Sequence, residues 1–451
     1  MQTPVLDFMF RYAGRGGERW HTPGHKGSSP QHGGFLEWTY DITEIGEMLT
    51  TPNPVSNSEA LMAETFGADR TWYSVGGATI PVMAAILAAI PFGSEVWVDR
   101  AIHRSVLGAL VIGGYRVHWL YPDWLRAGLA LPLTEFPATM TGASGLVVTR
   151  PTYDGLASNL SRTIQTAHDQ NLTVVVDEAH GSHWRRSAYP PSALALGADM
   201  VAHGVHKSEA TLTQTGLLHL QGARVSRSEV DRWFRVLQTS SPSYLLLASL
   251  DRLQWERHQA GANQAWEQLA EQARQLWTYL ESHGVAVLQS WAEHQGLMVD
   301  PSRLTLMGPG RRLGQVLARG GALEKSTVGS VTLFLAPGQS LDRVYELADD
   351  LGVVAGQVDF SLMPYPRLGA FLDIRQAWNT PGQWVALDQA ANRVLKDGLT
   401  PYPPGIPLAM PGEMLTQEAT DWLLEWLGSE CGIVEGVKDE GGRHCVWVIN
   451  D

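Results

Sequence analysis

Three clusters of polar residues combine side chains that could perform covalent and acid–base chemistry. Two of them directly follow apolar runs typical of strands, and the third directly precedes an apolar helical segment; they are Asp177-Glu178-Ala179-His180-Gly181, His203-Gly204-Val205-His206-Lys207-Ser208 and Gly76-Gly77-Ala78-Thr79. Together they offer a carboxylate, a lysine amine and a turn whose backbone can approach an anion closely. Because open α/β sheets bind ligands at the carboxyl ends of their strands, these clusters predict a binding site there.

Each cluster meets one need of pyridoxal 5′-phosphate (PLP). The amine of Lys207 can hold the cofactor aldehyde as a Schiff base. The carboxylate of Asp177 can pair with the pyridine nitrogen and keep it protonated, so that the ring accepts electrons. The turn 76–79 lies at the start of a predicted helix, where a phosphate is favoured, and His103 is the candidate to stack on the ring. Each residue alone has an ordinary structural explanation, and it is the ordered set that favours PLP.

Strands and helices that alternate along the chain must position these clusters. The pattern predicts strands at 95–99, 117–121, 145–149, 173–176, 200–202 and 217–220, with helices at 60–66, 80–90, 105–112 and 160–170 between them. Such alternation requires crossover connections, so we expect an α/β fold with a mostly parallel sheet that helices cover on both faces.

Changes in composition and in hydrophobic periodicity along the chain indicate four regions. Residues 1–57 read as an irregular N-terminal arm, and residues 58–283 as the large PLP-binding domain, which ends in one long helical stretch over 247–283. Residues 284–399 alternate short strands and helices and predict a smaller α+β domain. Residues 400–451 form a C-terminal extension that we expect to pack on this small domain, with a helix at 417–427 and a last strand at 446–449.

Composition and charge exclude several other classes of protein. Of the 451 residues, 44% are hydrophobic and 18% are charged, which is too apolar for a disordered chain, and the net charge of −13 argues against nucleic-acid binding. No apolar run is long enough for a membrane span, and no signal peptide is recognisable at the N-terminus. Cys431 and Cys445 are too few for a disulfide framework. We therefore expect a cytoplasmic enzyme with no membrane partner.

Longer motifs resemble the Orn/Lys/Arg decarboxylase family, PLP enzymes with the aspartate-aminotransferase fold (fold type I). The resemblance covers roughly residues 8 to 450. The motifs that carry it are His21-Thr22-Pro23-Gly24-His25-Lys26-Gly27, Asp41-Ile42-Thr43-Glu44, Phe66-Gly67-Ala68-Asp69-Arg70-Thr71, Pro151-Thr152-Tyr153-Asp154-Gly155, Val176-Asp177-Glu178-Ala179-His180-Gly181-Ser182-His183, His206-Lys207, Thr239-Ser240-Ser241-Pro242-Ser243-Tyr244, Pro401-Tyr402-Pro403-Pro404-Gly405-Ile406-Pro407 and Pro411-Gly412-Glu413.

The resemblance implies a role for each matching residue. Lys207 would form the Schiff base, Asp177 would pair with the pyridine nitrogen, His180 would lie beside the ring, and His103 would stack on its face. The turn Gly77-Ala78-Thr79 would bind the phosphate, and His206 would sit beside the phosphate or help to position the substrate. Because family members build active sites at a dimer interface, the turn at Ser241 would reach the neighbouring subunit's site in a homodimer or a higher oligomer. The arm at residues 21–27 would close over that site.

Three departures from the family pattern stand out. Relatives carry Asn-Gly-Ser or Asn-Gly-Thr where this chain has Gly76-Gly77-Ala78, and Ser-Thr-His-Lys where it has Gly204-Val205-His206-Lys207. Two or three hydroxyls expected near the phosphate are therefore missing, and each lost hydrogen bond to a charged group weakens binding by roughly 1.5–3 kcal/mol if nothing replaces it. The N-terminal wing domain of the large relatives is not recognisable, which resembles the compact form of the family.

The implied reaction is decarboxylation of arginine, lysine or ornithine to the amine and CO2, as in polyamine biosynthesis. Lys207 or His206 would return a proton to Cα. A basic substrate calls for an acid at the far end of the pocket, and Glu413, Glu44 and Glu324 are the candidates. Two alternatives stay open at this point: another PLP reaction, such as aminotransfer or an elimination, and a weakly active or inactive paralogue with a regulatory binding role.

Overall fold

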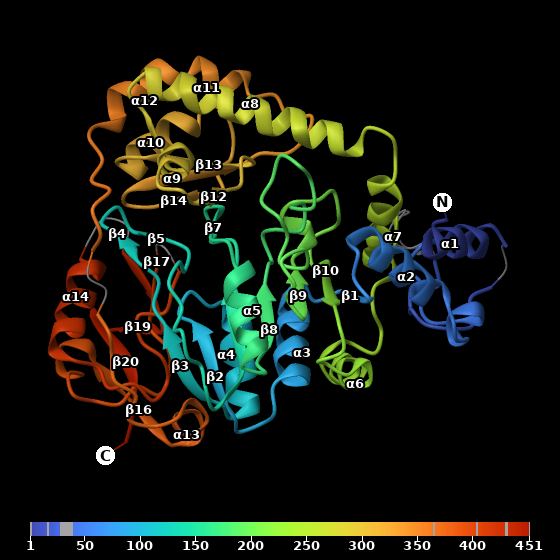
Figure 1. The fold of residues 1–451 in the computed structure, drawn as a ribbon, viewed down its shortest axis with the longest axis horizontal. Helices are drawn as coiled ribbons and strands as arrows, with labels where there is room; N and C mark the ends of the chain where they lie inside the picture. The colour runs from blue at the N-terminus through green and yellow to red at the C-terminus, as the bar shows by residue number, and fades with distance from the viewer. Residues whose placement is uncertain are drawn as a thin grey trace.

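A seven-stranded sheet forms the centre of the large domain (Figure 1). The computed structural model describes residues 2–15, 18–27, 39–363, 366–402, 405–428 and 432–450. The strand order is β1 (Arg70–Ser74), β10 (Gly216–Leu220), β9 (Met200–His203), β8 (Thr173–Asp177), β6 (Ala143–Thr149), β2 (Glu95–Asp99) and β3 (Arg116–Leu120). From β9 to β3 all neighbours are parallel, and β10 is antiparallel to both β1 and β9, which confirms the predicted mostly parallel sheet.

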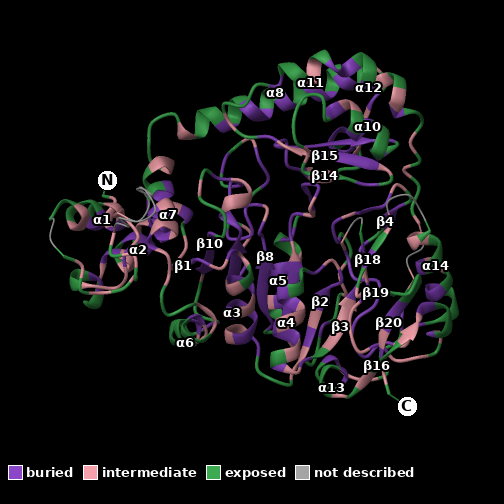
Figure 2. Ribbon diagram, turned by 180° about the vertical axis from the view of Figure 1, so that it is seen from behind, coloured by how far each residue is buried: buried purple, intermediate pink, exposed green. Residues whose placement is uncertain are grey.

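Helices cover both faces of this sheet, as expected. On β8, Val174 and Val176 face an apolar cluster that contains α5 (Ser161–Asp169), while Val175 faces the cluster of α3 (Thr79–Ala89) and α4 (Arg104–Gly113). The two-residue period of a strand sends alternate valines to opposite faces. Figure 2 shows the buried residues gathered in the sheet and on the inner sides of the helices.

The small domain is built on a second, four-stranded sheet. Its order is β11 (Ala286–Val287), β13 (Arg303–Met307), β15 (Ser330–Phe334) and β14 (Lys325–Ser326), and its helices are α8 (Ala262–Ser282), α9 (Leu288–His294), α10 (Gly310–Leu317), α11 (Asp342–Glu346) and α12 (Ala348–Ala355). The short pair β7 (Leu156–Ala157) and β12 (Met298–Val299) connects it to the large domain.

The predicted single helix over 247–283 is wrong. The structure has α7 (Tyr244–Arg257), a break, and then α8. Gly261 precedes α8 with a φ of +87°, a conformation that favours glycine and cannot continue a helix. The chain therefore turns here and passes from the large domain to the small one (Figure 1).

The N-terminal region is more regular than expected. Among its described residues it contains α1 (Pro4–Gly14), the 3₁₀ turn η2 (Gly46–Leu49) and the start of α2 (Pro54–Phe66). Pro4 stands at the first position of α1, where its missing N–H costs nothing. Val5, Phe8 and Met9 of α1 are buried in the same cluster as α2 and α7, so tertiary packing stabilises a helix whose composition did not indicate one.

The C-terminal segments lie beside β3 and α4 (Figure 1). They comprise α13 (Ile374–Asn379), β16 (Gly382–Ala386), η4 (Leu387–Gln389), β17 (Thr400–Tyr402), α14 (Gln417–Leu427), β18 (Ile433–Glu435), β19 (Val437–Glu440) and β20 (Arg443–Ile449). Pairing of β16 with β20 crosses the expected boundary between residues 399 and 400, and the division into four regions stays a prediction.

Smaller elements complete the fold. They are the pair β4 (Trp124–Leu125) and β5 (Leu129–Ala130), α6 (Arg227–Leu237), and the 3₁₀ turn η3 (Val205–Lys207) that carries the candidate lysine. In the described part of the chain, no helix combines the length and the apolar character that crossing a membrane requires. Cys445 is buried as a free thiol, and Cys431 lies outside the described residues.

Candidate active site

Two neighbouring parallel strands bring the first two polar clusters together. Asp177 is the last residue of β8 and pairs with Ala202 of β9, so the loops that follow both strands leave the sheet at the same edge. The N–H of Gly204 donates to the carbonyl of Ala179 at 3.1 Å and ties the two loops to each other. In this arrangement the Nζ atom of Lys207 lies 3.0 Å from Nε2 of His180.

Burial lowers the pKa of the Lys207 amine and so favours its neutral form. Burial is the largest cause that lowers its pKa, the charge of Arg303 acts in the same direction, and the carboxylates of Asp177 and Glu324 oppose them. Burial and the charge of Lys207 also hold the pKa of His180 well below its usual range. An unprotonated amine is the nucleophilic form, so the environment suits attack on an aldehyde.

Asp177 is the carboxylate of this group. Its side chain is 4% exposed, and Oδ1 accepts a hydrogen bond from the N–H of Ala179 at 3.1 Å. The charge of Asp177 favours the protonated forms of both Lys207 and His103. Asp177, Lys207 and His103 therefore lie close enough for their charges to interact, as they must if all three contact the pyridine ring of one PLP molecule.

His103 begins α4 as its N-cap. Its Nδ1 accepts a hydrogen bond from the N–H of Ser105 at 3.2 Å, so in the neutral ring Nε2 carries the proton. Burial lowers the pKa of His103, with Asp177 opposing and Lys207 assisting. The residue is nevertheless exposed on one side, which leaves a ring face for a ligand.

The glycine-rich turn at residues 76–79 has a backbone conformation that suits phosphate binding. Gly77 adopts a φ of +63°, and a Cβ there would come 3.7 Å from Cε1 of His206. Ala78 is the N-cap of α3, and Thr79 begins the helix. Nδ1 of His206 donates to the carbonyl of Thr215 at 2.8 Å, so Nε2 is an acceptor in the neutral ring and can donate to an anion only in the imidazolium form. Backbone N–H groups at a helix start and a histidine beside them suit a phosphate.

A buried atom without a partner supports a ligand in this place. Nδ1 of His180 is buried and has no hydrogen-bond partner among the described residues, while Nε2 of the same ring contacts Lys207. A native structure rarely leaves such an atom unsatisfied. The amine, the carboxylate, the turn and the unsatisfied ring atom therefore fit PLP as a set.

Of the three acids proposed for the substrate, only Glu324 lies close to Lys207. Its charge acts on the Lys207 amine, and its carboxylate accepts a hydrogen bond from the hydroxyl of Tyr153. Glu413 is instead buried against Arg100, with both of its carboxylate oxygens bonded to the guanidinium at 2.8 and 2.7 Å. Glu44 lies beside Tyr244, whose pKa its charge raises in addition to the effect of burial.

Ser241 stands apart from the other predicted site residues. It is exposed in the loop before α7, and its N–H donates to Oγ1 of Thr239 at 3.2 Å. The arm at residues 21–27 is held among its own neighbours, with His25 paired to Asp41 at 3.0 Å. The roles of both segments at a second subunit stay predictions.

Apart from Glu324, sequence reasoning missed the side of the site that the small domain provides. Arg303 of β13 and Phe334 of β15 lie next to the loop of His180, and Tyr153 packs against both His180 and Phe334 with ring centroids 5.0 and 5.6 Å apart. Nothing in the local pattern of β13 distinguishes Arg303 from any other strand residue.

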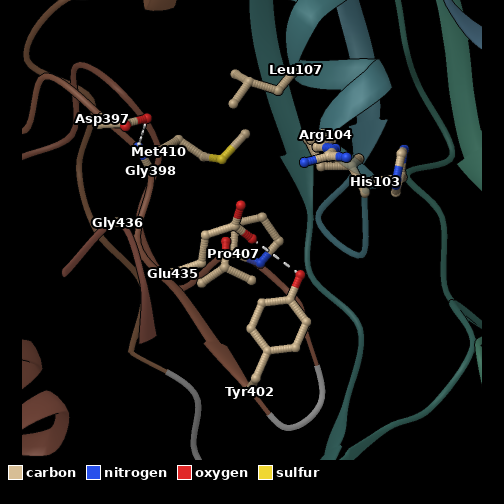
Figure 3. Close-up of a pocket in the computed structure, with 13 residues that line it drawn as sticks. His103, Arg104, Leu107, Asp397, Gly398, Tyr402, Pro407, Met410, Glu435 and Gly436 are labelled. Carbon is tan, nitrogen blue, oxygen red and sulfur yellow. Dashed lines mark hydrogen bonds between the residues drawn. The ribbon is translucent and has the colours of Figure 1, made fainter. Parts of the chain in front are cut away.

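A cavity of about 410 Å³ opens on the other side of His103 (Figure 3). It lies between the start of α4 and the strands β17 and β18, and Arg104, Asp397 and Glu435 provide its charged groups. The hydroxyl of Tyr402 donates to Glu435 at 3.2 Å across its floor. Pro403 and Pro404 of the Pro-rich motif lie outside the described residues.

Family models match most of the sequence. The family "Orn/Lys/Arg decarboxylase, major domain" matches residues 3–312, and the C-terminal domain of the same family matches residues 374–430. An arginine decarboxylase of Bacillus subtilis is 28% identical over 488 aligned positions, which cover 100% of this chain and 98% of that protein.

Solved structures share the fold. The constitutive lysine decarboxylase of Escherichia coli superposes with a TM-score of 0.84 at 20% identity, covering 100% of this chain and 82% of that one. A serine palmitoyltransferase of Sphingomonas wittichii reaches a TM-score of 0.54 at 13% identity, covering 78% of this chain and 84% of that one. Because the major-domain match alone spans well over half of the sequence, this chain belongs to the Orn/Lys/Arg decarboxylase family.

Proposed function

We propose that this chain holds PLP on Lys207 and decarboxylates a basic amino acid to the amine and CO2. The observation that carries the proposal is the position of the Lys207 amine, 3.0 Å from Nε2 of His180 and close enough to Asp177 for its charge to act on the amine. Membership of a family of amino-acid decarboxylases supports the reaction class.

Each residue of the site has a part in this proposal. Lys207 provides the covalent attachment, Asp177 holds the pyridine nitrogen protonated, and His103 stacks on the ring. The turn Gly77-Ala78-Thr79 receives the phosphate, and His206 lies beside this turn. When bound, PLP supplies an electron sink for the bond that breaks at the substrate Cα.

The proton that replaces CO2 has two candidate donors, Lys207 and His206. The amine of Lys207 contacts Nε2 of His180, whereas Nδ1 of His206 donates to the carbonyl of Thr215. We propose Lys207 as the donor to Cα and His206 as a phosphate ligand. His180 positions the Lys207 amine through the hydrogen bond to Nε2.

Glu324 is the acid that we propose for the substrate side chain. It approaches Lys207 from the small domain, and its carboxylate is held by Tyr153. A carboxylate fixed by a neighbouring hydroxyl can bind either an ammonium or a guanidinium group, so arginine, lysine and ornithine remain the substrates to compare.

A panel of amino acids tests the function directly. The purified chain, with PLP added or omitted, is assayed for CO2 and amine product from arginine, lysine, ornithine and, as a neutral control, leucine. PLP-dependent CO2 release from a basic amino acid is the expected result. Transfer of the amino group to an added 2-oxo acid without CO2 release would favour an aminotransferase, and absence of both activities together with absence of Schiff-base absorbance would favour a binding role.

The proposal includes a cytoplasmic homodimer with shared active sites and an amine product that feeds polyamine synthesis. If the turn at Ser241 serves the partner's phosphate, two inactive variants should complement each other. Mixed dimers of Lys207→Ala and Ser241→Glu would then regain activity in one of their two sites, whereas the separate proteins would not. Light scattering would establish whether the chain is dimeric at all.

A further inference from the structure

Arg303 is a buried cation at the edge of the active site that the proposed chemistry does not use. It lies in β13 of the small-domain sheet, and its side chain is 1% exposed. Gly155 makes room for its stem, because a Cβ at Gly155 would come 2.6 Å from Cγ of Arg303. Gly155 also has a φ of +82°, so the loop after β6 is shaped to accept this arginine.

The guanidinium of Arg303 contacts both the loop that carries His180 and the loop that carries Lys207. Nη2 donates to the carbonyl of His180 at 3.4 Å and to Oγ of Ser208, the residue after Lys207, at 3.3 Å. The carbon of the guanidinium lies 3.7 Å from the centroid of the Phe334 ring. A single side chain of the small domain thus touches the residues on either side of the Lys207–His180 contact.

Arg303 forms no direct ion pair among the described residues, although the negative charges of Asp300 and Glu324 act on its guanidinium. Its Nε is buried without a hydrogen-bond partner, and its hydrogen bonds are all 3.3 Å or longer. The nearest acid on its own segment, Asp300, is engaged by His183 at 2.9 Å and by Ser302 at 2.6 Å. A buried arginine usually has a paired carboxylate, so this arrangement is costly for folding alone.

We propose that Arg303 is a positioning residue of the active site, which fastens the small domain to the loops of His180 and Lys207 and places a positive charge without a direct ion pair beside the Lys207 amine. The inference rests on the proposed function, because it gives the charge a purpose only if Lys207 carries PLP.

The charged groups around Lys207 fix the direction of the effect. Asp177 from β8 and Glu324 from the segment before β14 raise its pKa, and burial and Arg303 lower it; His103 and His180, both with lowered pKa values, are the other titratable groups that face it. Removing the charge of Arg303 should therefore raise the pKa of the nitrogen of Lys207, both as a free amine and in its Schiff base. The protonated Schiff base would then persist to higher pH.

A spectroscopic titration tests this without any turnover. The absorbance of the PLP-loaded protein is recorded against pH for the wild type and for Arg303→Met, Arg303→Gln and Arg303→Lys, with Arg274→Met, an exposed arginine of the same domain, as the matched control. The two uncharged variants should move the midpoint upward by roughly one pH unit, as expected for loss of a nearby like charge. In Arg303→Lys, which keeps the positive charge, the midpoint should stay close to the wild-type value. Arg274→Met should leave the midpoint unchanged.

Kinetics and folding separate the remaining outcomes. The uncharged variants should lose kcat with little change in KM. A rise in KM alone, with an unmoved midpoint, would assign Arg303 to binding of the substrate carboxylate and overturn the inference. Unfolding of both uncharged variants while Arg303→Lys folds would overturn it in favour of a purely structural charge. Absence of Schiff-base absorbance in the wild type would instead refute the proposed function itself.

Discussion

The amine of Lys207 and the ring of His180 meet at 3.0 Å, although they belong to loops after different strands. Burial lowers the pKa of both groups, and the charge of Lys207 lowers that of His180 further. Both shifts favour the uncharged forms. An unprotonated amine is the form that attaches to an aldehyde, and His180 is a fixed neighbour that orients it.

Replacement of Lys207 by Ala should abolish both turnover and covalent cofactor binding. Without the amine no Schiff base can form, so the absorbance of the purified protein above the aromatic band should disappear and borohydride should no longer fix PLP to the chain. The exposed Lys438, which pairs with Glu440, provides the control Lys438→Ala. Retained turnover in Lys207→Ala would contradict the assigned role.

Glu324→Gln should raise KM for the basic amino acid by more than tenfold and lower kcat far less. The carboxylate lies near Lys207 and is held by Tyr153, and a charge-assisted hydrogen bond contributes about 1.5–3 kcal/mol. Steady-state kinetics with arginine, lysine and ornithine would measure it, with the exposed Glu346→Gln as the control. If Glu435→Gln raised KM instead, the substrate side chain would occupy the cavity of Figure 3.

Much of this site could be predicted from the sequence, because the end of a strand is determined by residues that are neighbours in the chain. The run Val174-Val175-Val176-Asp177 predicts a buried strand with its carboxylate at the end, and β8 ends at Asp177. The helix predicted over 417–427 has the same bounds as α14. In both segments the apolar pattern agrees with the packing, so the pattern alone was sufficient to predict the strand and the helix.

The parts that could not be predicted depend on contacts between distant segments. Arg303 reaches the site only because the small-domain sheet folds against the loop of His180. Glu413 follows a family motif, but its partner Arg100 lies more than three hundred residues earlier and occupies the whole carboxylate. Sequence spacing carries no information on such pairs.

Glu413→Ala should destabilise the fold without changing substrate affinity. The carboxylate is 2% exposed and is the ion-pair partner of the fully buried Arg100, and removal of one member of a buried pair costs about 3–5 kcal/mol. Thermal or urea unfolding would measure the loss. A selective rise in KM with normal stability would restore Glu413 as a substrate ligand. Glu95→Ala, which removes an exposed pair with Arg116, is the control for stability.

Glu209 should contribute to acid denaturation. Burial by itself would raise its pKa, but Arg257 and Arg186 together lower it to about 2. A carboxyl whose pKa falls on folding stabilises the native state above its unfolded pKa, and this contribution is lost as the pH falls from about 4.5 towards 2. Unfolding by urea should therefore show that Glu209→Gln is less stable than the wild type at pH 7 and that the difference shrinks across this interval. An unchanged difference at low pH would contradict the shift.

Ala78→Ser and Gly204→Ser should have opposite effects on PLP affinity, although both restore a hydroxyl of the family pattern. Ala78 is the half-buried N-cap of α3, where a hydroxyl can reach a phosphate, and one hydrogen bond to a charged group should tighten binding roughly tenfold or more. At Gly204 a Cβ would come 3.1 Å from the carbonyl of Ala179 and 3.2 Å from Cδ of Lys207.

Crowding of the Lys207 stem should therefore weaken binding in Gly204→Ser, and Gly204→Ala, which adds the same Cβ without the hydroxyl, should weaken it to the same extent. Absorbance titration of the cofactor-free wild type and of the three variants with PLP gives the four dissociation constants. Tighter binding by Gly204→Ser than by both Gly204→Ala and the wild type would show that the hydroxyl outweighs the crowding. In that case glycine at position 204 would weaken the phosphate site, whereas the packing around Lys207 indicates that it provides the space in which the amine lies.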